Sequence, residues 1–215
     1  MKLELSRARI AIAAALALLT MAGAAGAAVV VLGWSAGGSR LTLHGDAIWP
    51  GSGRPAPAVR LRDSAGREVS LASFRGRVVM LAFLDSHCGQ QCPVQASQMA
   101  AVDRGLPAAE RPRIVVVSVN PADSRLSVAR FVHKARWTGP WVWMTGTRSQ
   151  LRPVWRRFGI QVLNTTRTID GIKVPNIAHS SAIYLLDANG RERTGYVSPF
   201  LPRLVIEDVR ALESA

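Results

Sequence analysis

Hydrophobic residues gather into two runs of strand length, at residues 78–84 and 114–119. Such a run predicts a strand buried on both faces of a sheet, because a strand with one exposed face alternates apolar and polar residues. Pro93 favours a helix over about residues 93–104, since proline fits the first turn of a helix. Two buried strands joined by a helix predict a βαβ unit.

The residues on either side of this unit extend it to a single α/β domain, which we expect to cover residues 58–215. Apolar residues flanking a turn at 64–66 predict a short β-hairpin before the unit. The dipeptide Asn189-Gly190 is a strong hairpin signal and predicts paired strands around it. The remaining predicted elements are helices at 124–137 and 148–158, strands at 182–186 and 193–197, and a closing helix at 204–212. This order is typical of a thioredoxin-like fold, in which helices flank a central mixed β-sheet.

The first 38 residues begin with basic side chains and continue as a long uncharged stretch. Lys2, Arg7 and Arg9 precede residues 10–38, which contain no charged side chain. The stretch is longer than the roughly 20 residues that a helix needs to cross a bilayer, so it predicts a transmembrane helix. Basic flanks stay in the cytoplasm. Residues 1–38 are therefore expected to be a cytoplasmic tail and a single-pass anchor in the cell membrane, with the domain on the extracytoplasmic side.

A cleaved signal peptide is the alternative interpretation of this segment. Ala25-Gly26-Ala27 fits the small-residue pattern of a cleavage site, although the apolar stretch continues beyond it to Leu32. Both interpretations export the domain. Residues 39–57 are rich in glycine and proline, which is the composition of a linker between the membrane and the domain.

The chain is strongly basic, yet its composition does not indicate nucleic-acid binding. It has 27 lysines and arginines against 14 aspartates and glutamates, a net charge of +13. Only Lys2, Lys134 and Lys173 are lysines, and an arginine excess of this kind fits coding bias in a proteome rich in alanine, glycine and arginine. The six tryptophans do not form the aromatic and basic motifs of nucleic-acid modules, so we expect no nucleic-acid partner.

Two cysteines, Cys88 and Cys92, follow the first hydrophobic run in a C-x-x-x-C-P sequence at the predicted start of a helix. The unpaired N–H groups and the positive dipole end of a helix start stabilise a thiolate. Two neighbouring thiolates bind a soft metal ion or close reversibly into a redox-active disulfide. A static structural disulfide is the plainer alternative, but its short loop adds little stability.

His179 precedes the predicted strand at 182–186. In a thioredoxin-like sheet this strand runs antiparallel to the strand before the cysteines, so we expect His179 to face Cys88 and Cys92 across about one strand spacing. Two thiolates and an imidazole suit Cu(I) and also hold Cu(II). Without that context, a histidine before a strand is more often a surface residue. His87 adjoins Cys88 and is interpreted as a solvated loop residue; the alternatives are that it lowers the pKa of Cys88 or acts as an additional metal ligand.

The chain from about residue 57 to residue 214 resembles the Sco/SenC family, in a branch that reads F-L-D-x-x-C-x-x-x-C-P. Besides the cysteines, the similarity is carried by Phe83-Leu84-Asp85, Val119-Asn120-Pro121, Trp143-Met144-Thr145-Gly146, Val154-Trp155 and Ala178-His179-Ser180. The resemblance implies a copper chaperone for cytochrome c oxidase assembly, with Cys88, Cys92 and His179 as copper ligands. The implied partner is an apo-oxidase copper subunit or another exported cuproprotein. Gly89-Gln90-Gln91 and Asn120-Pro121 depart from the family, which usually has acidic residues at both places.

Two functions of different classes remain open on the sequence. A copper chaperone binds the ion and transfers it, whereas a thiol–disulfide oxidoreductase uses Cys88 and Cys92 to reduce a partner's cysteines. His179 distinguishes them, because a disulfide reductase has no need of it. Thioredoxin-like reductases also usually have two residues between the cysteines, and this chain has three. A peroxiredoxin fits poorly, since Asp85 stands where its threonine would be, and a redox-silent interaction module leaves the cysteines and His179 unexplained.

Overall fold

The two hydrophobic runs form neighbouring parallel strands at the centre of a sheet. The computed structural model describes residues 41–215, except for the side chains of residues 167, 169 and 173–175. Within it, β5 (Val79–Leu84) pairs in parallel with β6 (Arg113–Ser118), and α2 (Gln91–Arg104) connects them. The predicted βαβ unit is therefore confirmed.

Antiparallel strands flank the parallel ones and make the sheet mixed. The strand order is β1-β11-β10-β5-β6-β7-β3-β4, and β2 also pairs with β11. β10 (Ala182–Leu186) runs antiparallel to β5, whereas β7 (Trp141–Thr145) runs parallel to β6. The other strands of this sheet are β1 (Ala47–Ile48), β2 (Arg54–Pro55), β3 (Arg60–Asp63), β4 (Glu68–Ser70) and β11 (Arg191–Val197).

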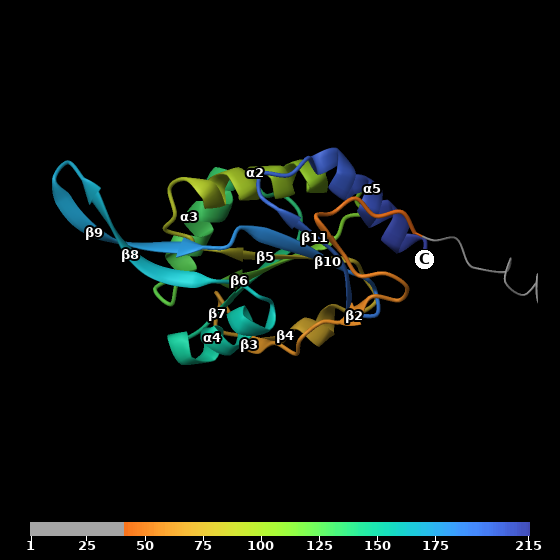
Figure 1. Cartoon of the computed structure of the whole chain (residues 1–215), viewed down its shortest axis with the longest axis horizontal. Helices are drawn as coiled ribbons and strands as arrows, with labels where there is room; N and C mark the ends of the chain where they lie inside the picture. The colour runs from red at the N-terminus through yellow and green to blue at the C-terminus, as the bar shows by residue number, and fades with distance from the viewer. Residues whose placement is uncertain (1–40) are drawn as a thin grey trace, which may run out of the picture. The chain divides into compact units, whose positions relative to one another are not determined.

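Helices cover both faces of the sheet (Figure 1). α2, α3 (Arg125–Ala135) and α5 (Pro202–Glu213) pack on one face. α4 (Arg148–Arg157) and the short 3-10 helix η1 (Leu71–Phe74) pack on the other face. Each helix lies within two or three residues of its prediction from the sequence, except η1, which was not predicted.

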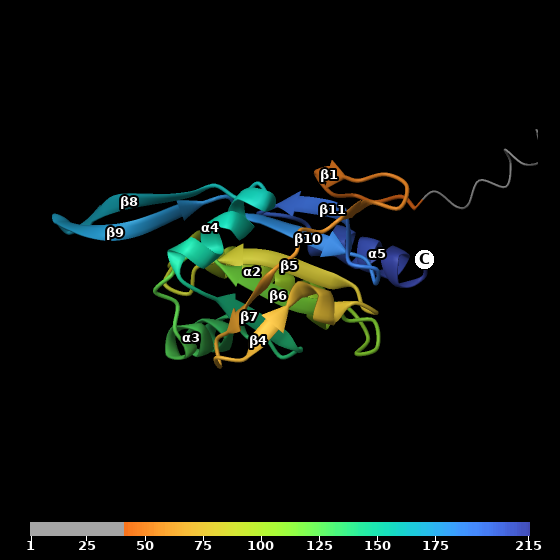
Figure 2. The ribbon, with the colours of Figure 1, turned by 90° about the horizontal axis from the view of Figure 1, so that it is seen from below.

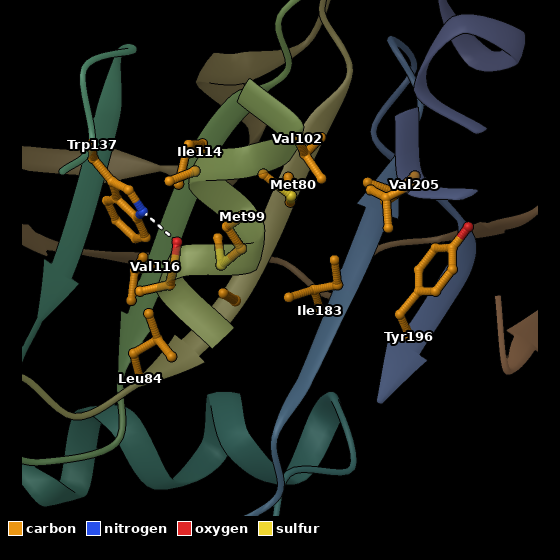
Figure 3. Packing of buried hydrophobic residues seen from close by; sticks show 14 of the residues in the cluster. Met80, Leu84, Met99, Val102, Ile114, Val116, Trp137, Ile183, Tyr196 and Val205 are labelled. Carbon is orange, nitrogen blue, oxygen red and sulfur yellow. Dashed lines mark hydrogen bonds between the residues drawn. The ribbon is translucent and has the colours of Figure 1, made fainter. Parts of the chain in front are cut away.

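The alternating directions of side chains along β5 explain why its sequence is continuously apolar. Met80, Ala82 and Leu84 belong to the hydrophobic cluster beneath α2, and Figure 3 shows part of that cluster. Leu81 and Phe83 belong to the cluster beneath α4. All five side chains are completely buried, because helices cover the strand from both sides.

A second, two-stranded sheet was not predicted from the sequence. β8 (Val162–Ile169) and β9 (Ile172–His179) form an antiparallel hairpin that extends away from the rest of the domain in both views (Figure 2). The loop between the strands is Asp170-Gly171, and both residues have positive φ angles, 49° and 79°. This is the backbone that a two-residue hairpin turn requires.

The folded unit begins earlier than the sequence pattern predicts. Residues 41–57 were expected to belong to a linker, but β1 and β2 both pair with β11, and Leu43 is buried in the core beneath α2. The ring of His44 also forms a hydrogen bond with the buried carboxylate of Asp208, with 2.7 Å between Nδ1 and Oδ1. The predicted tail and transmembrane helix at residues 1–38 lie outside the described residues. Between residues 41 and 215 there is no helix with the length and hydropathy of a membrane span.

Candidate functional site

Both cysteines lie where β5 leads into α2. Cys92 occupies the first turn of α2 and is fully buried, whereas Cys88 precedes the helix and is partly exposed. The N-cap residue Gln90 makes no side-chain capping hydrogen bond. Instead, the backbone N–H of Cys92 donates to Sγ of Cys88 at 3.5 Å. The sulfur of Cys88 therefore takes the position that a capping oxygen occupies in most helices.

This arrangement makes the two thiols unequal acids. A hydrogen bond from the Cys92 thiol, helped by the backbone N–H groups of Cys92 and Gln90, lowers the pKa of Cys88 to about 5 despite its burial. The same hydrogen bond raises the pKa of Cys92, and burial and the charge of the Cys88 thiolate raise it further. At neutral pH Cys88 is thus the thiolate, and Cys92 is the thiol that donates to it.

His179, the last residue of β9, reaches the cysteines through its ring. Nε2 lies 3.2 Å from Sγ of Cys92, and Nδ1 lies 3.0 Å from the carbonyl oxygen of Ser180. Because a carbonyl oxygen only accepts hydrogen bonds, Nδ1 carries a hydrogen and donates to it, and Nε2 is the ring nitrogen that faces Cys92. Histidines that bind metals commonly have this arrangement, in which the second ring nitrogen donates to a backbone carbonyl.

The order of the strands brings His179 to this place. β10 is antiparallel to β5, so its start lies beside the end of β5, and residues 180 and 181 connect β9 to β10 at that edge. Gln95 of α2 holds this connection, because its fully buried side chain donates from Nε2 to the carbonyl oxygen of Ala182 at 3.0 Å. The structure therefore brings Cys88, Cys92 and His179 together from two separate parts of the chain.

A cavity of about 580 Å³ opens beside the three residues. Cys88 and His179 line it, together with His87 and Asn120, and Cys92 is completely buried. Two sulfurs and one imidazole nitrogen are a soft donor set, which fits copper better than it fits Mg²⁺ or Ca²⁺. The site has the residues and the access that binding of a copper ion requires.

The sequence did not single out two residues that support this site. Gln95 lies one helical turn after Cys92, which is the only signal that would have drawn attention to it. Asp123 follows β6 and accepts hydrogen bonds from the backbone and the hydroxyl of Ser86, beside the cysteine loop. No spacing in the sequence connects it with Ser86, because the two are joined only by the pairing of β5 with β6.

The SCO1/SenC family model matches residues 55–213, and this match covers most of the chain. The chain belongs to the SCO1/SenC family. No protein among the curated sequences matches it.

Solved structures of Sco proteins share the fold of this Sco/SenC chain. The structure of Arabidopsis thaliana ScoI with copper bound has a TM-score of 0.63 at 19% identity, over 77% of this chain and 100% of that one. The solution structure of apo Sco1 from Thermus thermophilus has a TM-score of 0.63 at 22% identity, over 82% and 99%. BsSco, described as a cytochrome c oxidase assembly protein with a disulfide switch, has a TM-score of 0.59 at 23% identity, over 75% and 95%. The predicted thioredoxin-like fold is confirmed.

Proposed function

We propose that this Sco/SenC protein binds copper through Cys88, Cys92 and His179 and delivers it to the copper subunit of a respiratory oxidase or to another exported cuproprotein. The observation that carries the proposal is the 3.2 Å contact between Nε2 of His179 and Sγ of Cys92, two residues that are 87 positions apart. Together with the two cysteine sulfurs, an imidazole nitrogen at this distance makes up a set of three soft ligands for copper. Copper bound to Arabidopsis ScoI supports copper as the cargo.

The groups of the site differ in what they contribute to binding and release. Cys88 already presents a thiolate at neutral pH, and Cys92 loses its proton when the ion binds, so binding releases a proton. His179 offers the ion its Nε2, because Nδ1 is taken up by the carbonyl oxygen of Ser180. Cys88 is the ligand that an incoming partner thiol reaches first, since it is partly exposed in the cavity while Cys92 is buried.

Replacing His179 by alanine separates copper binding from dithiol chemistry. We expect His179→Ala to lower Cu(I) affinity by at least the roughly 10–100-fold that even outer-shell changes cost, because one of three ligands is lost. The Cys88–Cys92 disulfide should still form, since the imidazole is not a partner in that bond. A competitive Cu(I) titration against a chromogenic chelator, run beside a disulfide-reduction assay on the same samples, measures both properties.

The matched control is His133→Ala, because His133 is an exposed histidine on α3. It should bind Cu(I) like the parent protein. If His179→Ala binds copper as tightly as the parent but loses reductase activity, the copper proposal is wrong and the oxidoreductase function replaces it.

Thiol–disulfide exchange is the second candidate function, and the low pKa of Cys88 favours it. Because its pKa is about 5, Cys88 is mostly thiolate at neutral pH, and a thiolate is the attacking group in disulfide reduction. Buried Cys92 is placed to act as the resolving thiol. BsSco, whose disulfide switch has been described, supports a redox role for such a pair. The two functions use the same dithiol and are compatible in one protein.

Attachment to the cell membrane is part of the proposed function and is supported by the uncharged stretch at residues 10–38. The protein is expected to remain with the membrane after carbonate extraction and to be digested by protease added from the extracytoplasmic side. Release into the medium with a new N-terminus near Ala28 would instead indicate a cleaved signal peptide.

A further inference from the structure

His87 lies directly before Cys88, and two buried carboxylates surround one side of its ring. Nδ1 lies 3.2 Å from Oδ1 of Asp123 and 3.5 Å from Oδ1 of Asp85. The side chains of these aspartates are 0% and 7% exposed, whereas the side chain of His87 is 49% exposed. The exposed imidazole therefore has one edge held against the interior of the protein.

The partners of Nδ1 determine which ring nitrogen carries the hydrogen. Both carboxylates accept, and so they favour a hydrogen on Nδ1. The hydroxyl of Ser86 lies 3.3 Å from Nδ1 but sits 2.6 Å from Asp123, to which it donates. The amide of Asn120 lies 3.4 Å from Nδ1 and donates to Asp85 at 2.9 Å. Nδ1 thus carries a hydrogen, and Nε2 is the ring nitrogen left for a ligand.

The carboxylate of Asp123 is fixed in position, and so is the ring that donates to it. Oδ1 of Asp123 accepts hydrogen bonds from the backbone N–H and the hydroxyl of Ser86. Oδ2 of Asp123 accepts hydrogen bonds from the hydroxyl of Ser118 and the indole N–H of Trp143. A carboxylate that holds one nitrogen of an imidazole while the other remains available is the usual setting of a metal-binding histidine. Within residues 41–215, no hydrogen-bonding partner of Nε2 is found.

His133 shows what an unconstrained histidine looks like in the same protein. It is exposed on α3, and its ring makes no hydrogen bond with any described residue. Four polar atoms instead lie within 3.5 Å of Nδ1 of His87. The contacts of His87 therefore differ from those of a solvated loop residue, which was the first interpretation of its sequence position.

His87 and Cys88 line the same cavity as His179, whereas Cys92 is completely buried. We propose that Nε2 of His87 is an additional copper ligand, which receives the ion at the cavity together with Cys88 before Cys92 and His179 complete the final site. This inference rests on the proposed copper function. No electron transfer is involved, since copper enters and remains as Cu(I) and only its ligands change.

Nitrogen NMR of the full-length protein in detergent tests the assignment. The chain has four histidines, so ¹⁵N-histidine labelling gives four pairs of ring signals, which single His→Gln variants assign. Without metal, Nδ1 of His87 should show the shift of a protonated nitrogen, because carboxylate oxygens lie beside it. When anaerobic Cu(I) is added to His179→Ala, the Nε2 signal of His87 should move, because it becomes the only imidazole in the cavity. The signals of His44 and His133 should stay unchanged.

The rate of copper uptake provides a second measurement. Transfer of Cu(I) from a chromogenic chelator should be about 10-fold slower to His87→Gln than to the parent. This is the lower end of the roughly 10–100-fold loss of affinity or activity that follows when a metal site loses a supporting residue. The equilibrium affinity should change much less, because Cys88, Cys92 and His179 remain. His133→Gln is the matched control and should load at the parent rate.

The outcomes separate this inference from the proposed function. If the parent protein binds no Cu(I), the copper function fails and the role of His87 fails with it. If the parent binds Cu(I) but the His87 signal of His179→Ala does not move, and His87→Gln loads at the parent rate, His87 is a structural residue and the inference is overturned.

Discussion

In the reduced protein, Cys88 is expected to be alkylated by iodoacetamide far faster than Cys92. Only the thiolate reacts, and the lowered pKa of about 5 makes Cys88 almost entirely thiolate at pH 7. Cys92 has a raised pKa and is completely buried, so it should stay unlabelled until the protein unfolds. As the pH falls from 7 to 4, labelling of Cys88 should slow with a midpoint near 5, because protonation removes the nucleophile. Timed alkylation followed by peptide mapping measures both rates.

Cys92→Ala is the matched variant, since it removes the thiol that donates to Cys88 but keeps the backbone N–H. The midpoint for Cys88 should then move to higher pH, because the hydrogen bond that lowers its pKa most is lost. Equal labelling of the two cysteines, or faster labelling of Cys92, would contradict the assignment of Cys88 as the nucleophile.

The sequence predicts those strands that have the same surroundings along their whole length. β5 and β6 are covered by helices on both faces, and this produces the continuous apolar runs from which they were predicted. The position of Cys88 and His179 at the same cavity was predictable for a related reason. One residue follows a central strand and the other precedes its antiparallel neighbour, so the topology alone brings them together.

The β8–β9 hairpin was missed because it has little hydrophobic pattern to detect. It extends from the domain, and Leu163 and Ile172 are 60% and 67% exposed. Val162 and Ile177, near its base, pack against the core, so burial imposes little alternation along the hairpin as a whole. The Asp170-Gly171 dipeptide at its turn is nevertheless a strong hairpin signal that identifies it in retrospect. The missed hairpin matters for the site, because its final residue is His179.

The early start of the folded unit and the role of Asp123 could not be predicted, since both depend on distant contacts. Residues 41–57 add to the sheet through the edge that β11 presents, which their glycine-rich and proline-rich sequence does not reveal. Asp123 binds groups from β6, from β7 and from the cysteine loop, so its importance appears only when the sheet is assembled. Side chains that connect several elements leave no periodic signal in any one of them.

Replacing Trp143 by alanine is expected to give the largest loss of stability among single substitutions near the site. Its side chain is completely buried on β7, where it packs edge-to-face against Phe131 at 5.3 Å between ring centroids. Its indole N–H also donates to Oδ2 of Asp123 at 3.2 Å. Removing a buried tryptophan typically costs about 3–5 kcal/mol, which is a large share of the roughly 5–15 kcal/mol by which folded proteins are stable. Urea unfolding followed by circular dichroism measures the change in free energy.

A second variant of Trp143 separates the contribution of its ring from that of its hydrogen bond, and a substitution on α3 provides the control. Trp143→Phe keeps most of the ring but removes the donor to a buried carboxylate, so it should cost about 1–3 kcal/mol. It should also loosen Asp123 and thereby shift the ring signals of His87, which Asp123 orients. Leu126→Ala on α3 serves as the exposed control, since Leu126 is 60% exposed, and it should change stability by no more than about 0.5 kcal/mol. If Trp143→Ala were no more destabilising than Leu126→Ala, β7 would not pack against α3 as described.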